Sequence, residues 1–259
     1  MKKILILYFS GAGATKRVAE LMCSFMSQIC TTDIFSIENN GDFNINDYDA
    51  FIIGTPVYHA APSYVVTDYF DSISPLLKAT PAFIYNTRAT WSCNTNRILA
   101  KQIKEKNIIT ITDRDYRSPA SDGSLIVPFI QRFFEFDKNL QQKIALDCTA
   151  FLKLLQKYTP RGYIPHFRFS SVINAPNKLA GQLTTFKIHL HREKCNKCGK
   201  CIKNCPHNAL DKDSSGYPVL ITKHCENCYR CIHHCPQMAL SLSKRKAPEK
   251  LLKYSRYSS

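Results

Sequence analysis

The chain has 259 residues, a formal net charge of +15, 44% hydrophobic residues and 21% charged residues. This length allows one sizeable core and a smaller appended unit, and the composition is ordinary for a globular protein. No apolar run approaches the roughly 18 residues that a membrane-spanning helix needs, so we expect no membrane span. The apolar stretch at residues 4–9 is also shorter than the core of a secretion signal, so we expect a cytoplasmic protein.

Short apolar segments alternate with amphipathic ones from the start of the chain to about residue 158. Helical faces with apolar residues three and four positions apart occur near 18–25, 66–73 and 140–155. Strands that alternate with helices predict an α/β domain with a doubly wound parallel sheet of five strands. The expected strands are residues 4–9, 34–37, 50–54, 82–85 and 108–112.

A glycine-rich turn follows the first expected strand and leads into a helix expected at residues 16–29. Backbone N–H groups converge at such a turn and the helix dipole favours an anion, so we expect a phosphate site. The turn ends the first strand of a doubly wound sheet, where ligands gather. It matches neither the Walker loop nor the dinucleotide fingerprint. Its residues are Ser10, Gly11, Ala12, Gly13, Ala14 and Thr15.

Eight of the 12 cysteines form two copies of C-x-x-C-x-x-C-x-x-x-C-P, which we call the first motif (residues 195–205) and the second motif (225–235). Three thiolates on a tight loop can hold three corners of an iron–sulfur cubane, whereas the fourth cysteine lies beyond the loop. Structural zinc, the alternative, uses separated pairs and does not explain the third cysteine or the duplication. This density predicts a metal framework in a reducing compartment. We expect ordinary core or surface positions for the remaining cysteines, Cys23, Cys30, Cys93 and Cys148.

The segment with both motifs resembles a bacterial-type two-cluster ferredoxin, in which the fourth cysteine of each run binds the other cluster. The resemblance implies a small α+β domain that carries two [4Fe-4S] clusters. The implied ligands of one cluster are Cys195, Cys198, Cys201 and Cys235. Those of the other are Cys225, Cys228, Cys231 and Cys205.

The sequence YFSGAGAT resembles the phosphate loop of flavodoxins, and residues 54–58 resemble their second flavin loop. Residues 85–94 fall where the third flavin loop is expected. The whole chain therefore resembles the flavodoxin–ferredoxin fusion proteins of anaerobic microbes, which implies a flavodoxin-like first domain. It also implies FMN, with its phosphate on residues 10–15 and its ring between the other two loops.

Two features of these loops bear on how FMN would bind. Ala12 and Ala14 stand where the family usually has Thr and Asn, so two side-chain contacts to phosphate are lost and we expect weaker binding. Tyr58 and Trp91 are candidates to stack on the flavin ring, because aromatic faces suit a planar ligand. Each could instead be a residue at the rim of the site or over a loop. Pro56 and Val57 complete the second loop.

The chain therefore divides into four expected parts. Residues 1–158 form the flavodoxin-like domain, and 159–185 form a connector punctuated by proline and glycine. Residues 186–243 form the two-cluster ferredoxin domain. Residues 244–259 form a basic tail.

Positive charge gathers in the C-terminal part of the chain. We see no nucleic-acid module and expect no nucleic-acid partner. The charge is either an ordinary solvated face or a docking surface for an acidic redox partner protein. The lysines around the first motif are Lys194, Lys197, Lys200 and Lys203, and the basic residues of the tail are Lys244, Arg245, Lys246, Lys250, Lys253 and Arg256.

We predict an electron carrier that passes single electrons between two [4Fe-4S] clusters and FMN. One alternative is an enzyme, a flavin-dependent reductase of a small acceptor fed by the clusters, for which His59 is the candidate proton donor. The other is a ferredoxin on a flavin-free scaffold that docks partners. Because all eight ligand positions are filled by cysteine, we expect the nearby histidines to be solvated neighbours. These are His207, His233 and His234.

Overall fold

The fold is given by a computed structural model, which describes residues 2–39, 43–121, 135–176, 188–221 and 224–242. The expected basic tail and part of the connector lie outside the described residues. Within those ranges, none of the helices combines the length and apolar character needed to cross a bilayer.

Five strands form the main sheet, in the order β2-β1-β3-β5-β6 with every neighbouring pair parallel. This arrangement confirms the doubly wound α/β fold. Because the order reverses beside β1, the carboxyl ends of β1 and β3 lie at the switch point, where ligands bind in such sheets. The strands are β1 (Lys3–Tyr8), β2 (Thr31–Ser36), β3 (Ala50–Tyr58), β5 (Thr80–Arg88) and β6 (Ile108–Arg117), while the short β4 (Ala61–Pro62) pairs with the end of β3.

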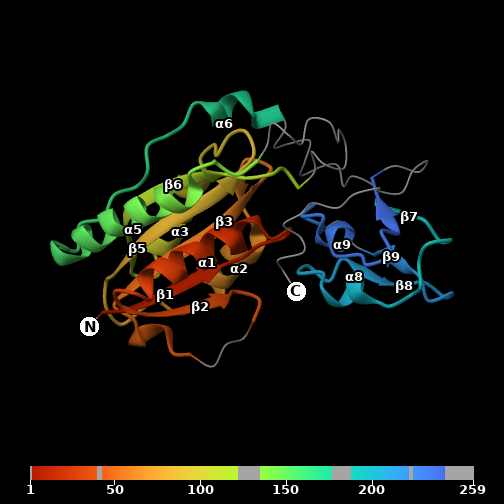
Figure 1. The fold of residues 1–259 in the computed structure, drawn as a ribbon, viewed down its shortest axis with the longest axis horizontal. Helices are drawn as coiled ribbons and strands as arrows, with labels where there is room; N and C mark the ends of the chain where they lie inside the picture. The colour runs from red at the N-terminus through yellow and green to blue at the C-terminus, as the bar shows by residue number, and fades with distance from the viewer. Residues whose placement is uncertain (1, 40–42, 122–134, 177–187, 222–223, 243–259) are drawn as a thin grey trace.

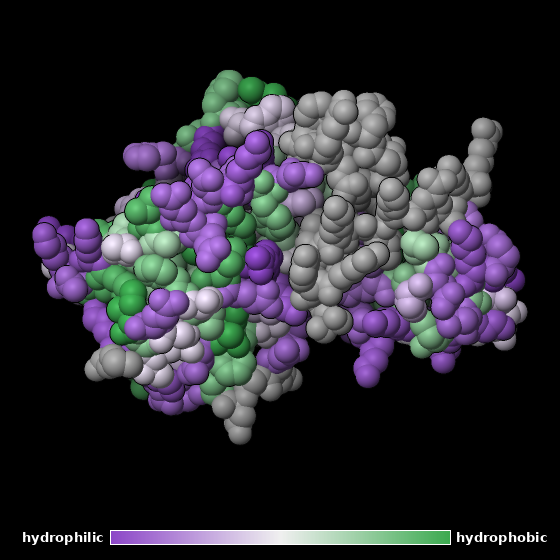
Figure 2. All heavy atoms as spheres, in the orientation of Figure 1, coloured by the Kyte–Doolittle hydropathy of each residue, from purple (hydrophilic) through white to green (hydrophobic). Residues whose placement is uncertain are grey.

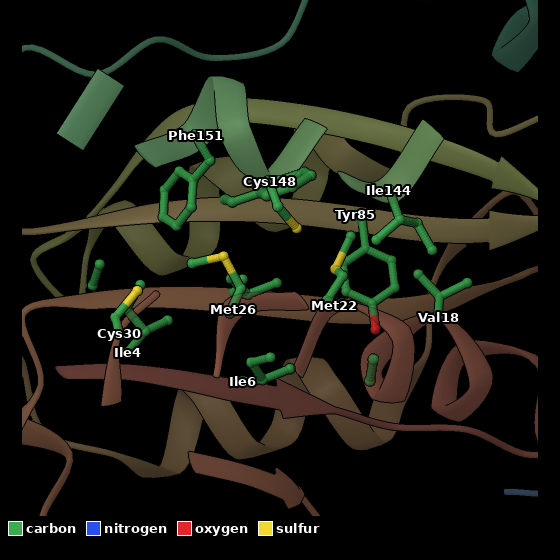
Figure 3. Packing of buried hydrophobic residues seen from close by; sticks show 14 of the residues in the cluster. Ile4, Ile6, Val18, Met22, Met26, Cys30, Tyr85, Ile144, Cys148 and Phe151 are labelled. Carbon is green, nitrogen blue, oxygen red and sulfur yellow. The ribbon is translucent and has the colours of Figure 1, made fainter. Parts of the chain in front are cut away.

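Helices cover both faces of this sheet (Figure 1). On one face, α1 (Ala14–Met26) and α5 (Leu140–Gln156) pack together against the strands, while α2 (Tyr64–Ser72) and α3 (Thr95–Lys104) cover the other face. Figure 3 shows the first of these cores, where Met22 and Met26 of α1 face Cys148 of α5. Cys30, Cys93 and Cys148 are buried and Cys23 is half-buried, and none lies in a cysteine motif.

Most element boundaries differ from the prediction by a few residues, and two of these differences have a clear physical reason. β2 begins at Thr31 rather than at residue 34, because it is an edge strand whose half-exposed positions tolerate polar residues. α1 begins at Ala14 rather than at residue 16. Its N-cap, Gly13, has a φ of 103°, a conformation that costs glycine little and ends the preceding turn.

The C-terminal unit repeats one local structure, with a short helix inside each motif: α8 (Lys200–Lys203) and α9 (Arg230–His233). Around them lie two small antiparallel sheets, β7 (His189–Leu190) with β10 (Leu240–Ser241) and β8 (Leu210–Lys212) with β9 (Pro218–Leu220). Its apolar core is small and centres on Tyr229, Ile232 and Leu240. The unit is therefore a small α+β domain that follows the doubly wound one, as predicted. A single-turn helix, α6 (Ser170–Ile173), lies in the connector.

Candidate functional site

A cavity of about 80 Å³ lies at the carboxyl ends of β1, β3, β5 and β6. The structure brings the first two predicted loops together there, along with the start of the third. Most of the predicted residues of the first two loops line the cavity: Ser10, Gly11, Ala12, Ala14, Thr15, Pro56, Val57 and Tyr58. Thr87, Arg88 and Ala89 line it from the third loop.

The first loop has the geometry of an anion site. The N–H of Gly13 donates to Ser10 Oγ at 3.1 Å, which closes the turn, and α1 begins at the next residue. Thr15 is buried, with its hydroxyl 2.8 Å from that of Thr87. The first turn of a helix leaves N–H groups without intrahelical acceptors, so the loop fits a phosphate group through its backbone. Ala12 and Ala14 add no polar side chain.

Tyr58 closes the cavity from the second loop. A Cβ at position 11 would collide with the Tyr58 hydroxyl, so the glycine is needed for this close approach. Trp91 is 55% exposed and is not among the residues that line the cavity, so its role on a flavin stays a prediction. His59 turns the chain from β3 to β4 with a φ of 48°. In the described part of the chain, its buried Nε2 has no hydrogen-bond partner.

The third loop is fixed by a charged cluster that includes Arg88, one of the residues that line the cavity. Arg88 forms an ion pair with Asp115, and Arg168 of the connector reaches the same carboxylate at 3.1 Å. Burial alone would raise the pKa of Asp115, but the hydrogen bond and charge of Arg88, together with Arg168, lower it below its ordinary value. The connector is therefore held against the sheet beside the third loop.

Residues 118–121, which follow β6, also line the cavity and were not predicted. The signal that could have identified them is positional. Ligands of a doubly wound sheet gather at the carboxyl ends of its strands, and β6 is the last strand of the sheet.

The first motif surrounds a second, apolar cavity, and Ile202 and Leu240 are among the residues that line it. Its four cysteines are those that the resemblance assigns to one cluster: Cys195, Cys198, Cys201 and Cys235. Burial, followed by the neighbouring Cys235 thiol, raises the pKa of Cys201 to about 11. The nearby lysines are exposed, and Cys198 is exposed as well.

The second motif also gathers its cysteines with one from the first. Burial is the main cause that raises the pKa values of Cys225 and Cys231. The nearby thiol of Cys205 raises both further, which places it beside them. Burial raises the pKa of Cys228 to about 12, and that side chain is only 7% exposed. A bound metal centre would supply the positive charge that turns these thiols into thiolate ligands.

The chemistry of the two sets of cysteines is that of iron–sulfur cluster ligands. Across the described ranges, no three His, Cys, Asp or Glu side chains come close enough together to hold a single metal ion. A four-iron cubane instead binds its thiolates at outer corners, with the cluster between them. The residues therefore fit two cubanes, and the ligand assignment stays a prediction.

The second motif packs directly against the first domain. Glu226, which is 3% exposed, accepts hydrogen bonds from the Ser63 hydroxyl at 2.7 Å and from the Tyr64 N–H at 2.5 Å. Ser63 is the N-cap of α2, so a carboxylate meets a helix N-terminus that favours negative charge. A Cβ at Gly11 would come within 3.0 Å of the Cβ of Cys228. The second motif therefore borders the phosphate loop.

Arg230 and His233 make two further contacts between the domains. The guanidinium of Arg230 donates to the carbonyl oxygens of Ser10 at 2.8 Å and Gly11 at 3.2 Å, and to both carboxylate oxygens of Glu38 at 2.5 and 2.6 Å. His233 Nε2 donates to the carbonyl oxygen of Ser121 at 2.8 Å. These contacts were not predicted from the sequence. A signal was present, because the two copies of the repeat differ there: the first motif has Asn196 and Lys200 where the second has Glu226 and Arg230.

The expectation that the nearby histidines are solvated is wrong. His233 is buried, and His207 lies with its Nε2 3.2 Å from Glu226. Burial, followed by Arg230 and other cations, lowers the pKa of His234 to about 4. The reason is the packing of the two domains against each other, which no local pattern in the sequence reveals.

Comparison with known families finds two models along the chain. A flavodoxin domain matches residues 5–112, and a 4Fe-4S dicluster domain matches residues 194–239. Among curated proteins, pyruvate synthase subunit PorD of Pyrococcus horikoshii is 40% identical over 67 residues, which cover 26% of this chain and 59% of that protein. The same subunit of Pyrococcus furiosus gives the same identity and coverage. The chain thus spans somewhat more than half the length of these relatives.

Solved flavodoxin structures are similar to the first domain. A flavodoxin from the domain Archaea covers 57% of this chain and 99% of its own, at 15% identity and a TM-score of 0.40. Oxidised flavodoxin 2 from Bacillus cereus covers 58% and 98%, at 16% identity and a TM-score of 0.45. The two family models by themselves give the chain the architecture of a flavodoxin domain fused to a 4Fe-4S dicluster domain, and they support FMN and iron–sulfur clusters as its cofactors.

Proposed function

We propose that this protein is an electron carrier in which the second motif's cluster exchanges single electrons with FMN held by the first domain. The first motif's cluster is then the point of exchange with other proteins. One observation carries the proposal: Cys228 of the second motif lies against Gly11 of the phosphate loop, whereas the cysteines of the first motif line a separate cavity.

The residues of the chain have distinct roles in this proposal. The backbone of residues 10–15 binds the phosphate of FMN, and Tyr58, whose hydroxyl lies over Gly11 in this structure, moves aside when FMN binds. Glu226 and Arg230 hold the second motif in place. Bound FMN supplies the ability to accept one or two electrons, which links single-electron carriers to hydride chemistry.

The partner is a redox protein that docks on the first motif. Lys194, Lys197, Lys200 and Lys203 are exposed there, and Figure 2 shows mainly hydrophilic residues over this lobe in the view drawn. A cluster of positive charges speeds the encounter with a negatively charged protein, so we propose an acidic partner. The similarity to a pyruvate synthase subunit favours an oxidoreductase of that class, or its carrier, as the partner.

One observation favours the flavin-free scaffold as a second candidate. At about 80 Å³, the cavity is smaller than the roughly 300–1,000 Å³ usual for ligand sites. FMN binding therefore requires the Tyr58 side chain to move off Gly11. In the second candidate the tyrosine stays, and the first domain serves only as a docking surface.

The test is anaerobic stopped-flow spectroscopy of full-length protein loaded with iron and FMN. After mixing with a low-potential donor, we expect the clusters to be reduced first and the flavin to follow at a rate independent of protein concentration. A flavin rate proportional to protein concentration would show transfer between molecules and contradict the proposal. Protein that takes up no FMN would decide for the flavin-free scaffold.

A further inference from the structure

Arg230 contacts the phosphate loop in an unusual way, through its carbonyl oxygens. Its guanidinium donates to the carbonyls of Ser10 and Gly11, which belong to two successive peptide groups. The side chain is 11% exposed, and its guanidinium stacks 5.0 Å from the centre of the Phe9 ring. A residue of the second motif thus fixes two peptide planes of the other domain.

The orientation of these peptides decides where their N–H groups point. In a planar trans peptide, the C=O and the N–H point in opposite directions. The Ser10 carbonyl belongs to the peptide that carries the Gly11 N–H, and the Gly11 carbonyl to the peptide that carries the Ala12 N–H. Arg230 is not among the residues that line the cavity, although Gly11 and Ala12 are. Holding both carbonyls toward Arg230 therefore turns both N–H groups away from it.

The charge of Arg230 acts through the backbone and not directly on a ligand. Glu38 accepts from the same guanidinium with both carboxylate oxygens, at 2.5 and 2.6 Å, which balances the cation locally. The effect of Arg230 on the phosphate loop is therefore to orient the backbone N–H groups that would bind a phosphate. This matters more here than in a loop with Thr and Asn, because Ala12 and Ala14 provide only backbone groups.

We propose that Arg230 is a positioning residue for FMN: it presets the phosphate-binding N–H groups of Gly11 and Ala12, so that docking of the second motif and binding of FMN support each other. This inference rests on the proposed function, because it requires FMN at this loop. Coupling between two binding events is reciprocal, so FMN also strengthens the docking by the same factor.

The test is a fluorescence titration of flavin into full-length, cluster-loaded protein, with FMN and riboflavin compared because riboflavin lacks the phosphate. We expect Arg230→Ala to weaken FMN binding roughly tenfold or more, as expected for lost hydrogen bonds to a charged group, and to leave riboflavin binding nearly unchanged. Lys200→Ala, at the equivalent position of the first motif, is the matched control and leaves both affinities unchanged. Arg230→Lys is intermediate, because an ammonium cannot hold both carbonyls and a carboxylate in one plane.

Iron content and the cluster spectrum show whether each variant is intact. If Arg230→Ala fails to assemble its clusters, Glu38→Ala in the first domain replaces it, and we expect a smaller FMN-selective weakening. An unchanged FMN affinity in an intact variant would overturn the inference, as would equal losses for FMN and riboflavin. Wild-type protein that binds neither flavin would instead overturn the proposed function, so the two failures are distinguishable.

Discussion

The first and second motifs share one cysteine spacing and one short helix, but they meet different surroundings. In the first, Cys198 is exposed and lysines surround the loop. In the second, Cys228 is buried against the phosphate loop, and Glu226 and Arg230 bond to the other domain. The two copies of the repeat therefore differ in position. We call the second motif, which packs against the first domain, the inner motif, and the first motif the outer motif; the cluster of each takes the same name.

Two positions of the repeat contribute strongly to the difference. Where the first motif has Asn196 and Lys200, the second has Glu226 and Arg230. Both charged side chains are nearly buried, and each is satisfied by partners across the interface. Breaking such a contact leaves a buried charge without its partners, which is strongly destabilising. We therefore expect the cysteines to hold the clusters, and the residues between them to set which motif packs against the first domain.

The largest expected effect is on the iron content, when the fourth cysteine of one motif or of the other is replaced by alanine. Cys205→Ala should remove the inner cluster, and Cys235→Ala the outer one, because each fourth cysteine lies with the other motif. Each variant should keep about half of the iron. Iron analysis and electron paramagnetic resonance identify the remaining cluster. Loss of the outer cluster in Cys205→Ala would contradict the crossed assignment.

The next effect concerns the interface. Glu226→Ala removes the acceptor of the Ser63 hydroxyl and the Tyr64 N–H, each a bond to a charged group worth about 1.5–3 kcal/mol. We expect faster hydrogen exchange at the Tyr64 amide and a looser pair of domains. Asn196→Ala, the matched change in the first motif, should leave this amide unchanged. Equal exchange rates in the two variants would mean that the inner motif does not dock through Glu226.

A third prediction concerns the loop that faces the inner motif. Ala12→Thr with Ala14→Asn restores two polar side chains to the phosphate site. We expect FMN to bind about tenfold tighter, since a hydrogen bond to a charged group is worth about 1.5–3 kcal/mol and part of this is spent on ordering the side chains. Titration of the double variant against the wild type measures the change. Unchanged affinity would place the phosphate elsewhere.

The smallest effect is expected at the outer motif. Lys197→Glu with Lys200→Glu should slow reduction by an acidic donor and flatten the salt dependence of the rate, because the Debye length falls from about 30 Å at 0.01 M to about 8 Å at 0.15 M. Lys101→Glu with Lys153→Glu makes the same charge change on the first domain. A salt-insensitive wild-type rate would show that the lysines form only a solvated face.

The sequence was informative where structure is local. Alternating strands and helices predicted the sheet, and the glycine turn predicted the loop that lines the cavity. It was uninformative where the two domains meet, because Glu226 and Arg230 find their partners more than 160 residues away in the chain. The histidines near the motifs, of which His233 is buried, were misjudged for the same reason, since their surroundings come from domain packing rather than from a local pattern.

The most direct test of the central claim is the cofactor content of full-length protein purified without oxygen. Two cubanes and one flavin predict about eight irons and about eight sulfides per chain, together with about one FMN after incubation with the flavin. About two zincs per chain without sulfide would contradict the cluster assignment. A full complement of iron with no FMN uptake would contradict the electron path between the inner cluster and the flavin.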